Sequence, residues 1–302
     1  MKRIFLKYCI TMICFGAALP LSAKILHEER SLYSTIVVTQ TGNTRCLQFD
    51  VRSEQRSQSC IDVRRPKQMV FSYTRMSITS VLFAEAPKNI LVIGLGGGTL
   101  PTAFHALLPQ ARIDVVEIDP AVISVAKSFF NFQPTSNLIV HAQDARVWTK
   151  RALLGPTRYD IIVLDAFNGE YIPEHLMTQE YLTETKSLLT PTGVLLANTF
   201  TGSNLYHNES TTYAKVFGPF INFRIPESAN RMIVAPNIKP TDTQLKARAA
   251  VWSDRLQPYG VPIVRFARLL TKQRREKPDW RQNARVLTDQ YAPANLLQSG
   301  DE

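Results

Sequence analysis

The sequence has 302 residues and a formal net charge of +10, and 45% of its residues are hydrophobic. This length suits one large domain with additions, or two domains, and the apolar fraction is ordinary for a globular protein. The sequence contains no internal repeat and no low-complexity tract, which excludes a repeat architecture.

The first 23 residues have the features of a secretory signal peptide. Lys2, Arg3 and Lys7 form a basic start, an apolar run of 14 residues covers Tyr8 to Leu21, and the small residue Ala23 suits cleavage. The run is too short to span a bilayer comfortably. We therefore expect an exported chain, periplasmic or secreted, with a net charge of +7 after cleavage and no transmembrane segment. The alternative is a cytoplasmic protein whose start is apolar by chance.

Residues 24–86 are predicted to form a small β domain. A strand is expected over Leu32 to Gln40, and Met69 to Phe83 has the apolar spacing of a helix. Cys46 and Cys60 lie in two strand-like runs around a polar turn near Ser53, where an antiparallel hairpin makes them face each other. In an oxidising compartment this pair predicts a disulfide, which closes a loop of about 15 residues and contributes roughly 3 kcal/mol at best. The alternative is two free buried thiols.

A glycine-rich stretch opens the next region, residues 87–237. A strand at Ile90 to Ile93 precedes it, a helix begins near Thr99, and a second strand at Ile113 to Val116 ends in Glu117. The glycines between the first strand and the helix are Gly94, Gly96, Gly97 and Gly98. This order is typical of the βαβ unit of a nucleotide-binding fold, in which glycines allow close approach to a ligand and the acid accepts ribose hydroxyls. The alternative is a tight turn that binds no nucleotide.

Strands and helices alternate through the rest of this region. We expect helices over Ala121 to Asn131 and Thr178 to Leu189. The expected strands are Leu138–His141, Tyr159–Leu164, Gly193–Asn198, Phe220–Ile225 and Arg231–Ala235. This alternation predicts an α/β fold with a mostly parallel sheet that helices cover on both faces.

Three acids follow three of the predicted strands: Glu117, Asp144 and Asp165. Ligands of such sheets bind at the carboxyl ends of the strands, where the glycine loop also lies. Three converging carboxylates repel one another unless a ligand supplies donors or positive charge. A nucleoside with a cationic tail would supply both, whereas a lone acid in such a position is more often a helix cap.

Residues 238–302 are predicted to be a basic, mainly helical extension. Residues 241–285 contain eleven Lys and Arg against four acids. Such a surface suits acidic lipid or nucleic acid, but a solvated helix face explains it more simply, and we expect no nucleic-acid partner. The five histidines show no metal-ligand spacing, so we expect no metal site.

Several motifs in this order resemble the spermidine synthase (polyamine aminopropyltransferase) family. The resemblance runs from about Ser31 to Phe200, with a looser tail at Val286 to Pro293. Its motifs are SLYSTIVV, FSYTRM, VIGLGGG, VEID, HAQDA and LDAFNGEYIPEHL. The resemblance implies a Rossmann-like, class I methyltransferase fold with a small N-terminal β domain. It also implies a homo-oligomer with a nucleoside co-substrate, decarboxylated S-adenosylmethionine or S-adenosylmethionine itself, and a polyamine acceptor.

The resemblance also implies roles for individual residues. Asp165 would orient the attacking amine and accept its proton, while Glu117 would hold the ribose. Asp144 matches the acid of an Asp-Gly pair beside adenine, with Ala145 in place of the glycine. The glycine loop completes the nucleoside site, and the acceptor would contact Gln58, Tyr73 and Asn168.

Two residues depart from the family pattern. Asn168 stands where the family has a second acid, and Gly97 stands where it has an acid that pairs with the amine of the decarboxylated donor. Because the acid is absent, we predict a site that takes S-adenosylmethionine at least as well as the decarboxylated donor. Three functions follow: an aminopropyltransferase; an S-adenosylmethionine-dependent methyltransferase, which Gly97 favours; or a non-catalytic exported module, which the signal peptide and Asn168 favour.

Overall fold

The computed structural model describes residues 23–51, 54–167 and 172–292. Residues 1–22 of the predicted signal peptide, the turn residue Ser53 and the site residue Asn168 lie outside the described residues. Within the described ranges, no helix combines the length and the apolar character that crossing a membrane requires.

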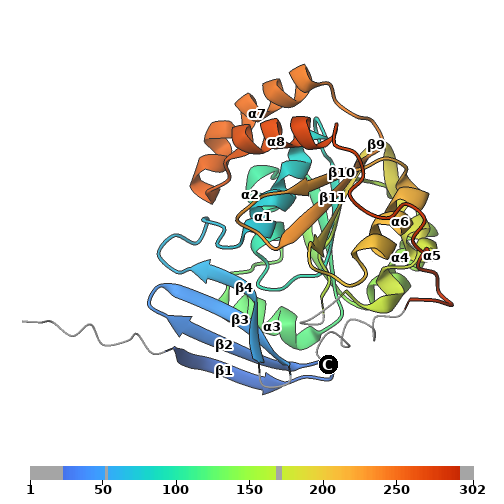
Figure 1. The fold of residues 1–302 in the computed structure, drawn as a ribbon. Helices are drawn as coiled ribbons and strands as arrows, with labels where there is room; N and C mark the ends of the chain where they lie inside the picture. The colour runs from blue at the N-terminus through green and yellow to red at the C-terminus, as the bar shows by residue number, and fades with distance from the viewer. Residues whose placement is uncertain (1–22, 52–53, 168–171, 293–302) are drawn as a thin grey trace, which may run out of the picture.

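The N-terminal region forms a four-stranded antiparallel sheet in the order β1-β2-β3-β4 (Figure 1). Its strands are β1 (Lys24–Arg30), β2 (Thr35–Thr41), β3 (Thr44–Val51) and β4 (Glu54–Asp62). The sequence analysis missed β1 and started β2 too early, at Leu32. The Ser31 hydroxyl accepts hydrogen bonds from the backbone N–H groups of Tyr33 and Ser34, and this turn delays the strand.

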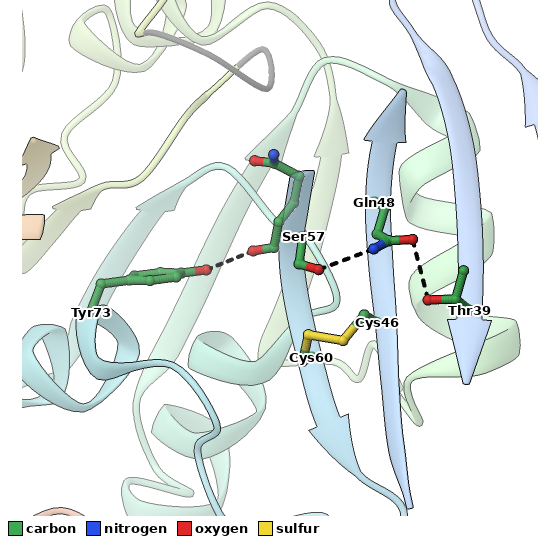
Figure 2. The surroundings of a disulfide bond; sticks show 7 residues. Thr39, Cys46, Gln48, Ser57, Cys60 and Tyr73 are labelled. Atoms are coloured by element: carbon green, nitrogen blue, oxygen red, sulfur yellow. Dashed lines mark hydrogen bonds between the residues drawn. A yellow bond between two sulfur atoms is a disulfide. The ribbon is translucent and has the colours of Figure 1, made fainter. Parts of the chain in front are cut away.

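The predicted disulfide between Cys46 and Cys60 is confirmed (Figure 2). The two cysteines are directly opposite each other in the β3–β4 ladder, with Cα atoms 4.1 Å apart. Beyond them the register slips by one residue, because Leu47 pairs with Ser59 while the next residue, Gln48, pairs with Ser57. Gln58 is therefore the extra residue of a β-bulge in β4.

The central sheet has seven strands in the order β10-β11-β9-β8-β5-β6-β7. Strands β5 to β9 are parallel, and β11 and β10 add an antiparallel pair at one edge. Every strand predicted in this region is present, at β5 (Asn89–Ile93), β6 (Arg112–Glu117), β7 (Leu138–Ala142), β8 (Tyr159–Leu164), β9 (Leu189–Phe200), β10 (Ile221–Arg224) and β11 (Asn230–Pro236).

Helices pack on both faces of this sheet, as predicted. One face carries α1 (Ser72–Ser77), the 3-10 helix η1 (Ile78–Leu82), α2 (Thr99–Leu107), α3 (Pro120–Phe129), α7 (Asp242–Leu256) and α8 (Ile263–Gln273). The other face carries α4 (Ala145–Leu153), α5 (Gln179–Ser187) and α6 (Tyr206–Phe217), with the short η2 (Glu174–Leu176). A separate cluster of buried side chains joins the N-terminal sheet to α3, so that this sheet lies beside the glycine loop.

Two helical predictions need correction. The helix expected from Met69 begins at Ser72, because Met69 forms an isolated β-bridge with Ile61 and donates its N–H to the Tyr259 carbonyl. The extension after residue 238 is helical only to Gln273, and residues 274–292 run back past α6 and α5 without a helix (Figure 1). The predicted domain boundaries remain a prediction.

Candidate active site

The glycine loop closes against the strand that carries Asp165. Gly94 has a φ of 96°, and a Cβ atom placed on it would lie 2.3 Å from the backbone oxygen of Asp165. Only glycine fits such a close approach of two backbones in this left-handed region. The loop and Asp165 are therefore brought together at the carboxyl ends of β5 and β8.

The Glu117 carboxylate fastens the glycine loop to the end of β6. One of its oxygens accepts a hydrogen bond from the Leu95 N–H and the other from the Asp119 N–H, each at 3.0 Å. Burial raises the pKa of Glu117, and these two hydrogen bonds oppose that rise. Each oxygen retains acceptor capacity, which a ribose hydroxyl could use.

Asp144 caps α4 and also contacts a histidine that the sequence analysis did not single out. Its Oδ1 accepts from the Val147 N–H at 2.9 Å, and its Oδ2 lies 2.8 Å from His175 Nε2. Ala145 is the first residue of α4 and is buried. Asp144 is therefore a helix cap, as the alternative reading of this acid expected. The exposed part of its carboxylate can still contact a ligand.

Asp165 is held by a short chain of amides. Asn198, which is buried in β9, donates from Nδ2 to Asp165 Oδ1 at 2.8 Å. The Oδ1 of the same amide accepts from Asn230 Nδ2 at 2.9 Å, which fixes which end of Asn198 faces the carboxylate. Burial raises the pKa of Asp165 to about 7, although the Asn198 hydrogen bond lowers it.

The Asp165 side chain lines a cavity of about 250 Å³ next to the glycine loop. Its walls combine aromatic side chains with hydrogen-bonding groups and come from both sheets. The aromatic residues are Phe49, Phe71, Tyr73, Phe167 and Phe200. The others are Ser57, Gln58, Leu95, Gly96, Asp165, Asn198 and Asn230.

Tyr73 and Gln58 meet at the β4 bulge. The Tyr73 hydroxyl donates to the Gln58 carbonyl at 3.0 Å (Figure 2), so α1 is tied to the strand that bends into the cavity. Burial, with the Asp165 carboxylate nearby, raises the pKa of Tyr73 well above its usual value. Tyr73 therefore stays protonated and keeps its donor.

The space beside Gly97 is filled by neighbouring elements. A Cβ atom placed on Gly97 would lie 2.8 Å from Ser59 Oγ and 2.9 Å from the Phe130 ring. An acidic side chain cannot occupy this position unless Ser59 and Phe130 both move. The packing of the N-terminal sheet and α3 against the loop therefore leaves no room for an acidic side chain at position 97.

A larger cavity, of about 600 Å³, lies between α6, β10 and the segment after α8. None of the three acids lines it, so we place the site at the smaller cavity, which contains Asp165. Among the residues described, no group of three or more His, Cys, Asp or Glu side chains is placed to hold a metal ion. The expectation of no metal remains a prediction.

Comparison with known proteins identifies the family. Residues 70–233 match the family model of the spermine/spermidine synthase domain. A polyamine aminopropyltransferase of Vibrio vulnificus is 48% identical over 277 residues, which cover 90% of this chain and 91% of that protein. The chain belongs to the spermine/spermidine synthase family.

Solved structures of similar fold agree with this family. A probable spermidine synthase from Corynebacterium glutamicum has a TM-score of 0.66 at 20% identity, covering 87% of this chain and 96% of that one. Human methyltransferase-like protein 13, in complex with SAH, has a TM-score of 0.54 at 24% identity, covering 71% of this chain and 97% of that one. The predicted Rossmann-like, class I methyltransferase fold is therefore confirmed.

Three polar residues of this family member were missed by the sequence analysis. Asn198 could have been found, because it is the polar last residue of the predicted apolar strand Gly193–Asn198, near the edge of the sheet where Asp165 follows its own strand. His175 and Asn230 carry no such signal, since only the fold brings them to Asp144 and Asn198.

Proposed function

We propose that the protein is an aminopropyltransferase that moves the aminopropyl group of an S-adenosylmethionine-type nucleoside to a polyamine or diamine. The observation that carries the proposal is the place of Asp165, on an aromatic-walled cavity against the glycine loop. Membership of the spermine/spermidine synthase family supports the same reaction.

Asp165 is proposed as the base. An alkylamine acceptor resembles lysine, with a pKa of about 10, so it must lose a proton before it can attack. The amine nitrogen then forms a bond to the carbon attached to the sulfonium sulfur, the carbon–sulfur bond breaks, and its electron pair remains on sulfur. The proton given up by the nitrogen passes to the Asp165 carboxylate. A pKa of about 7 keeps a useful fraction of Asp165 ionised at neutral pH.

The remaining groups are proposed to bind and orient the substrates. Aromatic faces suit the methylene chain and the ammonium of a polyamine. Glu117 would accept the ribose hydroxyls, and Asp144 with Ala145 would lie beside adenine, above the loop of Gly94, Gly96, Gly97 and Gly98. Gln58 and Tyr73 would contact the acceptor, and Asn168 is proposed for the same role on the resemblance alone.

The proposal is tested by assaying purified protein with putrescine and decarboxylated S-adenosylmethionine and detecting spermidine by mass spectrometry. Asp165→Asn should abolish turnover while it leaves the fold intact. Asp254→Asn is a matched control, because Asp254 is an exposed carboxylate on α7 and far along the chain from the site. Unchanged turnover in Asp165→Asn would contradict the assigned role.

We propose that the site accepts S-adenosylmethionine as donor at least as readily as the decarboxylated form. Gly97, closed in by Ser59 and Phe130, offers no carboxylate to repel the donor's own carboxylate. The nearby start of α2 presents unpaired N–H groups that favour an anion. Calorimetric titration with both nucleosides tests this, and a strong preference for the decarboxylated form would contradict it. A methylated acceptor among the products would instead identify the methyltransferase alternative.

Export is proposed as well. The disulfide between Cys46 and Cys60 supports an oxidising compartment. N-terminal sequencing of protein recovered from the periplasm or medium would test cleavage near Ala23. Nucleoside binding without turnover in that material would favour the non-catalytic alternative. A homo-oligomer is proposed by family resemblance, and light scattering would test it.

A further inference from the structure

Residues 286–292 of the C-terminal motif pack between helices of the central domain. Leu287 is fully buried and contacts Met177 and Leu205, with Ile172 and Tyr291 packed around them. Its carbonyl accepts from the Gln179 N–H at 2.8 Å, and its own N–H donates to the Thr212 hydroxyl at 2.9 Å. The motif therefore joins the start of α5 to the middle of α6.

Asp289 extends this attachment to α4. Its two carboxylate oxygens accept from the two terminal nitrogens of Arg146, each at 2.6 Å, and its N–H donates to Glu180 Oε2 at 3.0 Å. Arg146 lowers the pKa of Asp289. The Arg146 side chain is 15% exposed and that of Asp289 is 41% exposed, so the strength of this pair comes from its two parallel hydrogen bonds more than from burial. Glu184 of α5 is a second, more distant partner of Arg146, at 3.5 Å.

Arg146 is the second residue of α4 and follows Asp144 and Ala145 directly. Asp144 is linked in turn to His175, which lies three residues after Ile172. The C-terminal motif thus contacts residues on both sides of Asp144: Arg146 in the first turn of α4 through Asp289, and Ile172, near His175, through the cluster around Leu287.

We propose that Asp289 is a positioning residue that sets the affinity for the nucleoside by holding Arg146 and, with it, the first turn of α4. This inference rests on the proposed function, in which Asp144 contacts the nucleoside. Helix ends fray first, and α4 has only nine residues, so the loss of one anchor at its start shifts the Asp144 carboxylate. The acceptor cavity contains no atom of α4 and should be unaffected.

The test compares Asp289→Asn with Asp279→Asn in the full-length protein. Asp279 is a matched control, because it is an exposed aspartate of the same extension and pairs with Arg224 at the edge strand β10. Asp289→Asn should raise the Kd for S-adenosylmethionine and the KM for the donor about tenfold, within the range of such coupling effects, with the acceptor KM unchanged. Asp289→Glu should restore part of the affinity, and Asp279→Asn should bind like the wild type.

Melting temperatures are measured for all variants. Donor affinity within twofold of the wild type in Asp289→Asn would overturn the inference and leave the proposed function standing. Equal losses for donor and acceptor, tracking the melting temperature, would also overturn it, because a merely structural role predicts that result. Failure of the wild-type protein to bind either nucleoside would overturn the proposed function and this inference together.

Discussion

Replacing Asn198 by alanine should shift the pH dependence of the reaction to higher pH. The Asn198 amide stabilises the ionised form of Asp165 by donating to its Oδ1 at 2.8 Å. A hydrogen bond to a charged group contributes about 1.5–3 kcal/mol, and one pKa unit corresponds to about 1.4 kcal/mol. The pKa of Asp165, about 7 with the amide present, should therefore rise by roughly 1–2 units without it.

A base must be deprotonated to act, so activity falls as the pH drops below its pKa. The acid limb of kcat/KM should consequently move upward by the same roughly 1–2 units in Asn198→Ala, and the rates should approach those of the wild type at alkaline pH. The measurement is kcat/KM for the acceptor across the pH range. Because both proteins receive the same amine, its own titration cancels in their ratio.

Asn237→Ala provides the control for this shift. Asn237 follows β11 and donates to the Thr190 carbonyl at the opposite end of the same strands, away from Asp165. Its pH profile should match the wild type. An acid limb in Asn198→Ala that stayed in place or moved downward would refute the assignment of Asp165 as the base that this amide tunes.

Three further predictions concern stability. Because burial raises the folded-state pKa of Asp165, its ionisation opposes folding. Asp165→Asn should therefore raise the melting temperature, and this gain should grow from about pH 4 to about pH 7 and then level off. A gain at pH 4 as large as the gain at pH 7 would contradict this reasoning. The Cys46–Cys60 disulfide should stabilise the fold by roughly 3 kcal/mol, so its reduction should lower the melting temperature by about 6–12 °C in calorimetry. Reductant should cause no such loss in a variant with both cysteines replaced by serine. Burial alone would raise the pKa of Asp114, but hydrogen bonds with His141, Arg112 and Tyr159 outweigh it and lower the pKa to about 2. The stabilisation that Asp114 provides is therefore complete above about pH 4 and is lost as the pH falls towards 2. Asp114→Asn should therefore cost about 3 kcal/mol in urea unfolding at neutral pH, and a cost that persisted undiminished near pH 2 would contradict this reasoning.

The sequence predicted the central sheet well because its signals are local. Each parallel strand is a short apolar run, and the acids that follow the runs mark one edge of the sheet, where the structure places Glu117 and Asp165. The opposed cysteines also follow from sequence, since two strands and a turn determine which residues face each other.

The missing parts depend on contacts that are distant in the chain. β1 reads as a polar segment and becomes a strand only by pairing with β2. Two hydrogen-bonded pairs form only because β11 and the C-terminal segment pack beside their partners. They join Asn230 to Asn198 and Arg146 to Asp289. No local pattern encodes such pairs, so the link from Asn230 to Asn198 behind Asp165 could be found only in the fold.

The extra residue at Gln58 means that the length of β4, as well as its residue types, shapes the cavity beside Asp165. Because Ser57 already pairs with Gln48, deletion of Gln58 would close the bulge and keep Ser57, Ser59 and the disulfide in place. It would remove the carbonyl that accepts from Tyr73 and one residue of the cavity wall. A single insertion or deletion in this hairpin can thus remodel one wall of the cavity beside Asp165 and leave the central sheet untouched. In the proposed reaction this wall faces the acceptor, so one change of strand length would alter the fit of the acceptor in a single step.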